Sequence, residues 1–550
     1  MAQKHYVSVF QNTPILDNSE WINFNWRAIE NRVKFLRYRI FNASKKKDYE
    51  TVIKLQQLML NSSANILLSV RRITAINKQL SGMNKIRMHL IEDIMTLDFS
   101  HYKPITYENL IIPKTHRKQK LLKIQILKDQ CIQLIVKHAL EPQWEAQFEE
   151  NTYGGRPGRS SHDAINHLAQ IIKLYSSKKY ILTLDLGKYI YQFNGEIILK
   201  KIKFFPRVDL IFRWLKAGYI SSNIFSQSDL GLPQGDHISS LLANIALDEI
   251  DKVIKKQSVT TSTRSFYVRH EKSLAILAED IETVETINKI IRIWCQVVGG
   301  VNYSVNSDSI HSIEKGFNFL TVYFCPKYHY SASVSIVPNE QAIKEIREKL
   351  KNIWMRGRGK DVQWVLDKLN PRIREWCNYY CFYKSSQIFK DLDNWMFQRS
   401  VRYCKRTHPN KSWSWMQQKY FGRFNAKRNS KWIFGDKESG KYLTRLSWTI
   451  ARQYIPIQIQ ASPDNVMYKE YWNKRNSIGI TNNQLWNVAD FKIAQKQKHI
   501  CPVCENSLYN QEPIEKHRIL IKRNSSLISP FNMIFVHSIC YQCIKTYSSS

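Results

Sequence analysis

The chain has 550 residues, of which 82 are Lys or Arg and 46 are Asp or Glu, so its formal net charge is +36. An apolar fraction of 43% supports packed cores and excludes general disorder. Cations in this excess can neutralise phosphates and release counterions, so the composition favours a nucleic-acid partner; the alternative is a basic protein without one.

The ten cysteines do not form the pattern of a disulfide framework, because only four are paired in sequence, close to the C-terminus. This usage is typical of a reducing compartment. No run of about 18 apolar residues occurs, so we expect no membrane span. The first residues also lack the features of a signal or transit peptide. The six unpaired cysteines are Cys131, Cys295, Cys325, Cys377, Cys381 and Cys404.

The hydrophobic pattern changes along the chain. Residues 20–80 have apolar positions at helical spacing, for example Val33, Leu36 and Ile40. From about 111 to 325, strand-like runs such as 179–184 alternate with amphipathic helices, which predicts an α+β or α/β domain. A helix begins near residue 343, and basic and aromatic residues then dominate. Residues 456–500 carry turn residues and little periodicity, which predicts a linker.

Three segments of the chain contain recognisable motifs. The first is IPK at 112–114, followed by related residues up to 148. The second is YGGRPGRSSHDA at 153–164, and the third is GLPQGDHISSLLAN at 231–244. Each alone is compatible with ordinary turn chemistry. In this order and at these separations they resemble the reverse transcriptase–maturase proteins encoded inside group II introns.

The resemblance implies an α+β fold with the fingers, palm and thumb of a reverse transcriptase. It predicts five parts: a helical extension of the fingers (1–85), fingers and palm (86–330), a helical thumb or maturase (X) domain (331–455), a basic linker (456–500), and a small zinc module (501–550).

The polymerase chemistry of this family requires two Mg²⁺ ions held by carboxylates. The resemblance assigns the palm-strand aspartate to Asp185, but the family's next acidic position falls on Tyr191. The two aspartates of the family's Tyr-Ala-Asp-Asp hairpin fall on Lys272 and Ser273. Because an ammonium repels divalent cations, we expect no catalytic Mg²⁺ and no polymerase activity. The nucleotide-binding positions also depart from the family, at Lys120, Leu121 and Lys123.

The same alignment predicts that the Lys272 ammonium replaces the metal as the partner of Asp185. A buried carboxylate without a metal is costly unless it is paired. The alternative is that both side chains are exposed to solvent.

Rings and cations alternate between residues 354 and 450, as expected of an RNA-binding thumb. Trp376, Tyr379 and Tyr380 have helical spacing, which favours the thumb core over base stacking. The cations are the better candidates for RNA contact. The predicted RNA-binding residues are Arg156, Arg159, Arg399, Arg402, Lys405, Arg406, Lys411 and Arg423.

Two C-x-x-C pairs near the C-terminus predict a structural Zn²⁺ site with ligands Cys501, Cys504, Cys540 and Cys543. Redox chemistry is the alternative. The region is similar to the HNH-type endonuclease domain of many intron proteins. His517 matches one histidine of that domain, but Arg518 replaces the general base and cannot accept a proton. We therefore expect strand cleavage to be lost, and assign His517 and His537 to remnant or packing positions.

These features together predict a maturase that binds group II intron RNA and assists its splicing without reverse transcription. DNA is a possible second partner of the C-terminal module. Three alternatives stay open: an active reverse transcriptase and endonuclease, a general RNA-binding factor, and a decayed reading frame. Enrichment in Lys, Ile and Asn suggests an AT-rich genome, so we expect a plastid before a mitochondrion, with a bacterial cytoplasm as the alternative.

Overall fold

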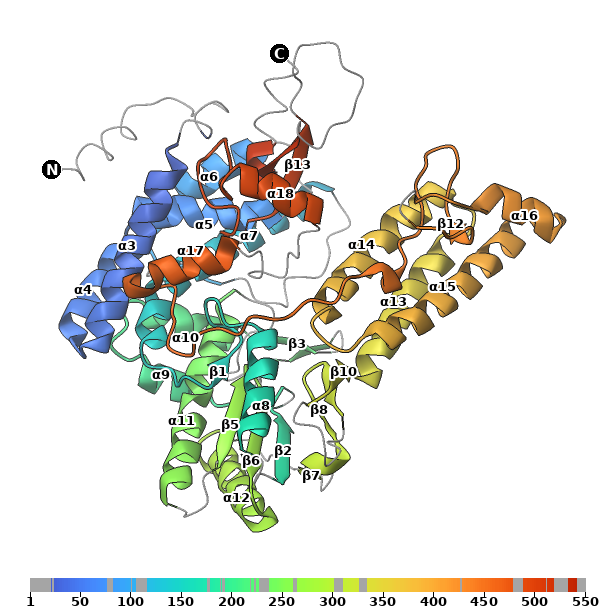
Figure 1. Cartoon of the computed structure of the whole chain (residues 1–550). Coiled ribbons are helices and arrows are strands. Elements are labelled where there is room, and N and C mark those ends of the chain that lie inside the picture. Colours follow the sequence, from blue (N-terminus) through green and yellow to red (C-terminus); the bar gives the residue numbers. More distant parts are fainter. Residues whose placement is uncertain are drawn as a thin grey trace.

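The computed structural model comprises an N-terminal group of helices, a palm sheet and a projecting helical arm (Figure 1). The residues that it describes are 21, 24–76, 83–99, 101–104, 116–175, 179–187, 189, 193–217, 219–221, 224–226, 237–260, 265–300, 310–325, 334–425, 428–477, 488–510, 512–518 and 533–541. No helix within these ranges combines the length and apolarity that a membrane crossing requires.

The N-terminal helices pack mainly against one long helix, α7 (His116–Glu145). Asn25 caps α3 and Asp48 caps α4 by accepting hydrogen bonds from the backbone N–H groups of Ala28 and Thr51, respectively. The helices predicted for 20–80 are present within the described part of that range. They are α3 (Trp26–Lys45), α4 (Tyr49–Leu60) and α5 (Ser63–Ile76), and α6 (Met83–Met95) follows them.

The palm is a five-stranded sheet in the order β1-β5-β6-β2-β7, and β5, β6, β2 and β7 form its antiparallel part. Alternation along β2 gives the sheet two buried faces: Leu182 and Leu184 pack in the core with α11 and α12, whereas Ile181 packs with α8 and the thumb. The strands are β1 (Thr152–Tyr153), β5 (Phe266–His270), β6 (Ser273–Ala278), β2 (Tyr180–Asp185) and β7 (Ile310–Ser312), and the helices are α8 (Ser161–Leu174), α11 (Ser239–Thr260) and α12 (Ile281–Val297).

Shorter elements complete the palm and connect it to the thumb. A three-stranded sheet in the order β10-β9-β8 lies where the chain leaves the palm. The remaining elements are α9 (Glu196–Lys201), α10 (Val208–Lys216), the hairpin of β3 (Tyr219–Ser221) and β4 (Ile224–Ser226), β8 (Phe317–Phe319), β9 (Val322–Phe324) and β10 (Ile336–Pro338).

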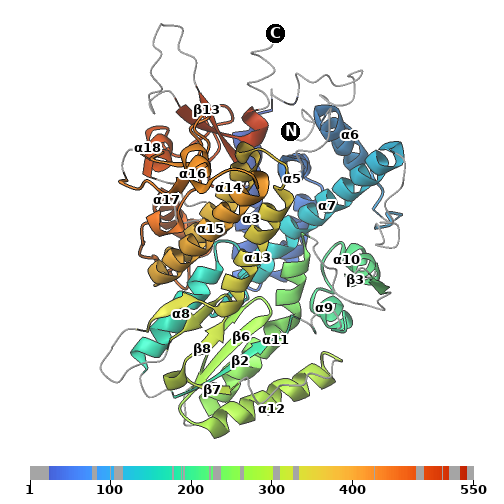
Figure 2. The ribbon, with the colours of Figure 1, turned by 90° about the vertical axis from the view of Figure 1, so that its right-hand side faces the viewer.

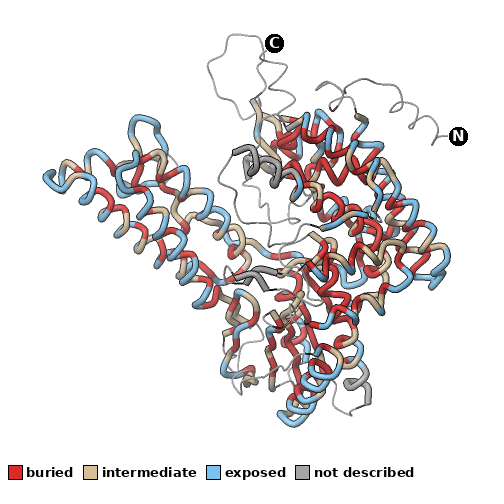
Figure 3. The backbone as a smooth tube through the Cα atoms, turned by 180° about the vertical axis from the view of Figure 1, so that it is seen from behind, coloured by how far each residue is buried: buried red, intermediate tan, exposed pale blue. Residues whose placement is uncertain are grey.

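The thumb is an arm of long helices that projects beyond the palm sheet in Figure 1. In Figure 2 the arm faces the viewer, and its helices appear above the palm strands. Tyr380 is buried and its ring centroid lies 4.5 Å from that of Trp376, so these rings belong to the thumb core as predicted. Buried and exposed residues alternate along the arm and along the outer N-terminal helices, and the buried residues gather toward the interior of the palm (Figure 3). The helices are α13 (Glu340–Arg356), α14 (Val362–Tyr380), α15 (Ser386–Thr407) and α16 (Trp413–Tyr420), and β11 (Phe421–Gly422) pairs with β12 (Ile433–Phe434).

Residues 449–477, which we term the return segment, lead from the thumb back to the fingers and palm. The backbone N–H of Ile457 donates to Asp163 at 3.0 Å, and Arg475 pairs with the same carboxylate at 3.1 Å. Asp464 pairs with Arg37 of α3 at 2.6 Å. The first part of the predicted linker is therefore attached to the fingers and palm, because Ile457, Asp464 and Arg475 bind partners there. It ends in α17 (Lys469–Ser477).

The C-terminal module contains α18 (Val488–Lys496) and a hairpin of β13 (Ile514–Arg518) and β14 (Met533–His537). It lies against the N-terminal helices in Figure 1. Two ion pairs join them, Arg27–Glu505 at 3.0 Å and Arg71–Glu512 at 2.7 Å.

The junction of palm and thumb should be sensitive to acid through His162. Burial lowers the pKa of its imidazole to about 4, and Nδ1 lies 2.6 Å from the Tyr383 hydroxyl. Between pH 6.5 and 4 the unfolded chain then binds more protons than the folded one, so stability falls as the pH falls through this window. We expect about 2 kcal/mol of this contribution to be lost by pH 5.

Urea unfolding at pH 7.5 and pH 5 tests this expectation. The free energy of unfolding should depend less on pH in His162→Phe than in the wild type. His89→Gln, at an exposed histidine, serves as the control. An unchanged pH dependence in His162→Phe contradicts the assignment.

Candidate functional site

The turn between β5 and β6 lies where the resemblance places the catalytic hairpin of the palm. Asp185, the last residue of β2, pairs directly with Ser273, the first residue of β6. Glu271 and Lys272 form the turn, and the Lys272 carbonyl accepts a hydrogen bond from the N–H of Leu186 at 2.9 Å. The predicted degenerate positions are therefore adjacent, except that Tyr191 lies outside the described residues.

The predicted ion pair between Asp185 and Lys272 is absent. Asp185 is exposed, and its carboxylate accepts a hydrogen bond from the N–H of Gly187 at 2.8 Å. The prediction assumed a buried carboxylate that needs a cation, whereas water solvates this one. Within the described residues, no group of three or more acidic, histidine or cysteine side chains suited to a metal includes Asp185.

A buried network of one ion pair and several hydrogen bonds lies beside this turn. Arg269 of β5 pairs with Asp251 of α11 at 2.6 Å, and its Nη1 donates to Asn244 at 2.8 Å. Asn244 in turn donates to the carbonyl of Gly154 at 2.9 Å. Gly154 has a φ of 71°, and an added Cβ would meet the Glu271 side chain at 2.6 Å. Gly154 and Asn244, from two of the segments that carry the resemblance, thus connect parts of the palm.

Arg156 and Arg159 do not fit the predicted role in RNA binding. Arg156 is buried, forms an ion pair with Glu145 at 2.9 Å and donates to two backbone carbonyls. Arg159 is also buried and donates to the carbonyls of Glu150 and Ile459. Because the fold itself binds these guanidinium groups, we assign them a structural role.

The other six predicted cations lie on the thumb. Arg402, Lys405 and Arg406 are exposed on α15, and Arg399 is half-buried with its guanidinium 5.0 Å from the Trp395 ring. Burial and the nearby charges of Arg402 and Arg406 lower the pKa of Arg399, which reflects a concentration of positive charge. Lys411 and Arg423 are exposed beyond α15. The ion pairs formed among described residues include none of these six.

A groove of 330 Å³ lies between α13 and α15 beside this cationic face. Trp395 and Arg399 line it from α15, and cations and carboxylates line it from α13. A flat ring next to several cations suits an unpaired base with its phosphate. The α13 residues are Glu340, Ile343, Lys344, Arg347, Glu348 and Lys351.

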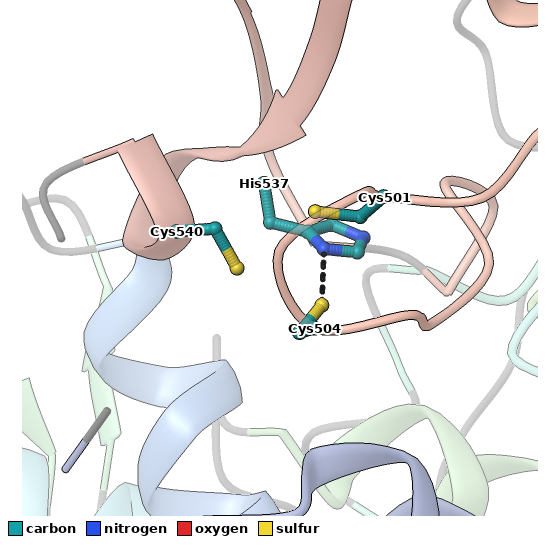
Figure 4. A group of neighbouring side chains, drawn as sticks. All are labelled: Cys501, Cys504, His537 and Cys540. Carbon is teal, nitrogen blue, oxygen red and sulfur yellow. Dashed lines mark hydrogen bonds between the residues drawn. The ribbon is translucent and has the colours of Figure 1, made fainter. Parts of the chain in front are cut away.

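The C-terminal module contains a compact candidate metal centre. Cys501, Cys504, His537 and Cys540 are all buried, and their ligand atoms lie within 4.8 Å of one another. Figure 4 shows the three sulfur atoms and the imidazole gathered around one point, with Cys504 Sγ 3.2 Å from His537 Nδ1. Soft thiolates with one imidazole at this spacing suit tetrahedral Zn²⁺ in a structural role.

His537 is a ligand candidate that the sequence analysis assigned to packing. Its Nε2 lies 3.2 Å from the carbonyl of Ser507, and a carbonyl can only accept. The proton therefore belongs on Nε2, which leaves the Nδ1 lone pair for a metal. The short spacing His537-x-x-Cys540 was the available signal. Cys543, the predicted fourth ligand, lies outside the described residues.

The positions related to an HNH endonuclease are only partly described. The His517 ring packs at 63° against the Tyr541 ring, with centroids 5.4 Å apart. This contact agrees with a packing role. The side chain of Arg518 lies outside the described residues.

Three family models match the chain in order. The N-terminal domain of reverse transcriptase matches residues 21–94, and the reverse transcriptase (RNA-dependent DNA polymerase) model matches 112–324. The group II intron, maturase-specific domain model matches 343–421, within the thumb.

Individual proteins with related names are also similar to this chain. Protein YkfC of Escherichia coli is 28% identical over 38% of this chain and 60% of its own length. Group II intron-encoded protein LtrA of Lactococcus lactis is 31% identical over 28% of this chain and 26% of LtrA. Maturase-like protein 1 of Euglena gracilis is 24% identical over 66% of this chain and 78% of that protein. The chain thus spans less than two thirds of the first two relatives.

Zinc binding by two variants distinguishes the two candidates for the fourth ligand. We expect His537→Gln to weaken Zn²⁺ binding by more than about tenfold, because it removes a ligand, and Cys543→Ser to change it little. Competition of the full-length protein with a chromophoric chelator measures both affinities. The reverse ranking would assign the fourth position to Cys543.

Proposed function

We propose that this chain, which belongs to the group II intron maturase and reverse transcriptase family, is a splicing maturase that no longer polymerises DNA. In this proposal the intron RNA carries out its own transesterification with its own Mg²⁺. The protein binds the RNA, neutralises its phosphates and stabilises the active RNA fold.

The main support for the loss of polymerase activity is the set of residues at the turn between β5 and β6. Asp185 is directly opposite Ser273, and Lys272 supplies a cation to the turn where the family has a metal-binding carboxylate. Two Mg²⁺ ions need several carboxylate oxygens converging on one point. A hydroxyl and an ammonium cannot provide them, so two-metal catalysis at this position is not supported.

The thumb supports RNA binding. Its exposed cations on α15 adjoin Trp395 and the groove between α13 and α15. Phosphate contacts from Lys and Arg provide affinity, and rings can stack on unpaired bases. The binding elements of the protein are therefore retained although the polymerase chemistry is degenerate.

The C-terminal module adds a second nucleic-acid-binding region to the proposed function. We infer that Zn²⁺ stabilises its fold and that its cations add nucleic-acid contacts, with DNA as a possible second ligand. Arg518, at the position of the general base of an HNH endonuclease, does not support strand cleavage. For localisation we propose an organelle, a plastid in preference to a mitochondrion, on the enrichment in Lys, Ile and Asn.

The rival function is an active reverse transcriptase that mobilises its intron. The family as a whole favours it, because the matched model describes an RNA-dependent DNA polymerase. Asp185 would then have to bind Mg²⁺ together with groups outside the described residues.

Primer extension and intron splicing separate the two functions. With Mg²⁺ and an RNA template, we expect the purified protein to incorporate no nucleotides above background. Lys272→Asp/Ser273→Asp should leave its splicing of the host intron unchanged at near-physiological Mg²⁺, since the RNA provides the catalytic metals. DNA synthesis by the wild type, or rescue of splicing by the double variant, would contradict the proposal.

Substitutions on the thumb test the RNA interface. We expect Arg402→Ala/Arg406→Ala to weaken intron binding and to reduce the slope of log affinity against log salt by about 1–2, because about two phosphate contacts are lost. Filter binding between 50 and 200 mM salt measures the slope. Arg372→Ala, at an exposed arginine of α14 that pairs with Glu375, is the control. Equal slopes for both variants would place the interface elsewhere.

A further inference from the structure

The candidate metal centre of the C-terminal module is contacted by a residue from the N-terminal helices. Arg71, on α5, is 1% exposed and forms two hydrogen bonds with Glu512, at 2.7 and 2.8 Å. Its Nη2 also lies 3.4 Å from Cys504 Sγ and 3.7 Å from Cys540 Sγ. One guanidinium thus contacts two candidate ligands and the carboxylate beside them.

The negative charge of the candidate metal centre favours a cation at the position of Arg71. With Zn²⁺ bound, three thiolates and a neutral imidazole leave one excess negative charge, and the buried Glu512 carboxylate beside them adds a second. The Arg71 guanidinium offsets one of these two charges. The ligands are buried, and a buried net charge is costly unless a counter-charge is close. N–H groups that donate to thiolate sulfurs also orient the ligands and adjust their electron density. Arg71 can do both, and within the described contacts of this centre it is the one residue from the N-terminal helices that does so.

Glu512 fixes the guanidinium in this position. Its carboxylate accepts both hydrogen bonds from Arg71, and its Oε2 lies 4.0 Å from His537 Nδ1. The guanidinium also lies 4.6 Å from the centroid of the Trp26 ring on α3. Arg71 is thus held by the N-terminal helices on one side and by the metal centre on the other.

We propose that Arg71 is an outer-sphere positioning residue of the zinc centre, so that zinc loading and docking of the C-terminal module on the N-terminal helices are one coupled event. The inference rests on the candidate metal centre and is independent of the proposed splicing function. Because coupling is reciprocal, the metal strengthens docking by the factor by which docking strengthens metal binding.

Two other arginines of the same helical region provide matched controls. Arg87, on α6, is equally buried, lies 5.2 Å from the Trp21 ring centroid and donates to Thr74 and Asn84. Arg37, on α3, forms an ion pair with Asp464 of the return segment. Substitution of Arg87 thus controls for the loss of a buried guanidinium. Substitution of Arg37 controls for the loss of an ion pair between the N-terminal helices and the return segment.

Chelator competition on the full-length protein measures the effect on zinc. We expect Arg71→Met to weaken Zn²⁺ binding roughly 10–100-fold, as is usual for outer-sphere partners. Arg71→Lys should recover part of the loss, and Arg87→Met and Arg37→Met should stay within about threefold of the wild type. Arg71→Met/Glu512→Gln removes the ion pair as a whole; its zinc affinity should remain low. Wild-type affinity in Arg71→Met or in this double variant overturns the proposal.

Hydrogen exchange tests the reciprocal effect and needs no variant. Removal of Zn²⁺ from the wild-type protein with a chelator should increase exchange of the α5 amides around Arg71, while the α14 amides of the thumb stay protected. Unchanged protection of α5 after complete removal of zinc would show that docking is independent of the metal, and the proposal would then be wrong. This result decides the matter even where Arg71→Met does not fold.

Discussion

Three buried arginine–carboxylate pairs close this chain upon itself: Arg475 with Asp163, Arg37 with Asp464, and Arg71 with Glu512. Each joins residues more than 300 positions apart. Such pairs need not add net stability, but loss of one partner strands a buried charge at a cost of about 3–5 kcal/mol. The positions of the return segment and the C-terminal module relative to the fingers and palm therefore depend on these contacts.

The core of the palm is built independently of the side chains that its turn exposes. Arg269, Asp251 and Asn244 bind one another below the turn, and their packing does not depend on which side chains the turn exposes. Asp185 is exposed at the end of β2, so its carboxylate needs no buried partner. Lys272 and Ser273 thus set the charge of the exposed turn without contributing to the buried network beneath it.

Short-range patterns in the sequence were sufficient for the helices, the palm strand ending at Asp185, the position of the turn at Lys272 and three of the proposed zinc ligands. Long-range contacts were not predictable, because nothing in the local sequence around Arg71 or Asp163 specifies a partner hundreds of residues away. The burial of Arg156 was missed for the same reason: a cation in a motif looks identical whether it contacts Glu145 or RNA. His537 was missed because the paired cysteines offered a complete ligand set.

The separation of 441 residues between Arg71 and Glu512 has a consequence for synthesis on the ribosome. At about 5–20 residues per second, roughly 20–90 s pass between translation of the arginine and arrival of its carboxylate. During this interval the first-made helices have a cationic, partly apolar surface without its cover. Apolar surface exposed in this way promotes aggregation, and truncated products that end before the module would leave the surface uncovered.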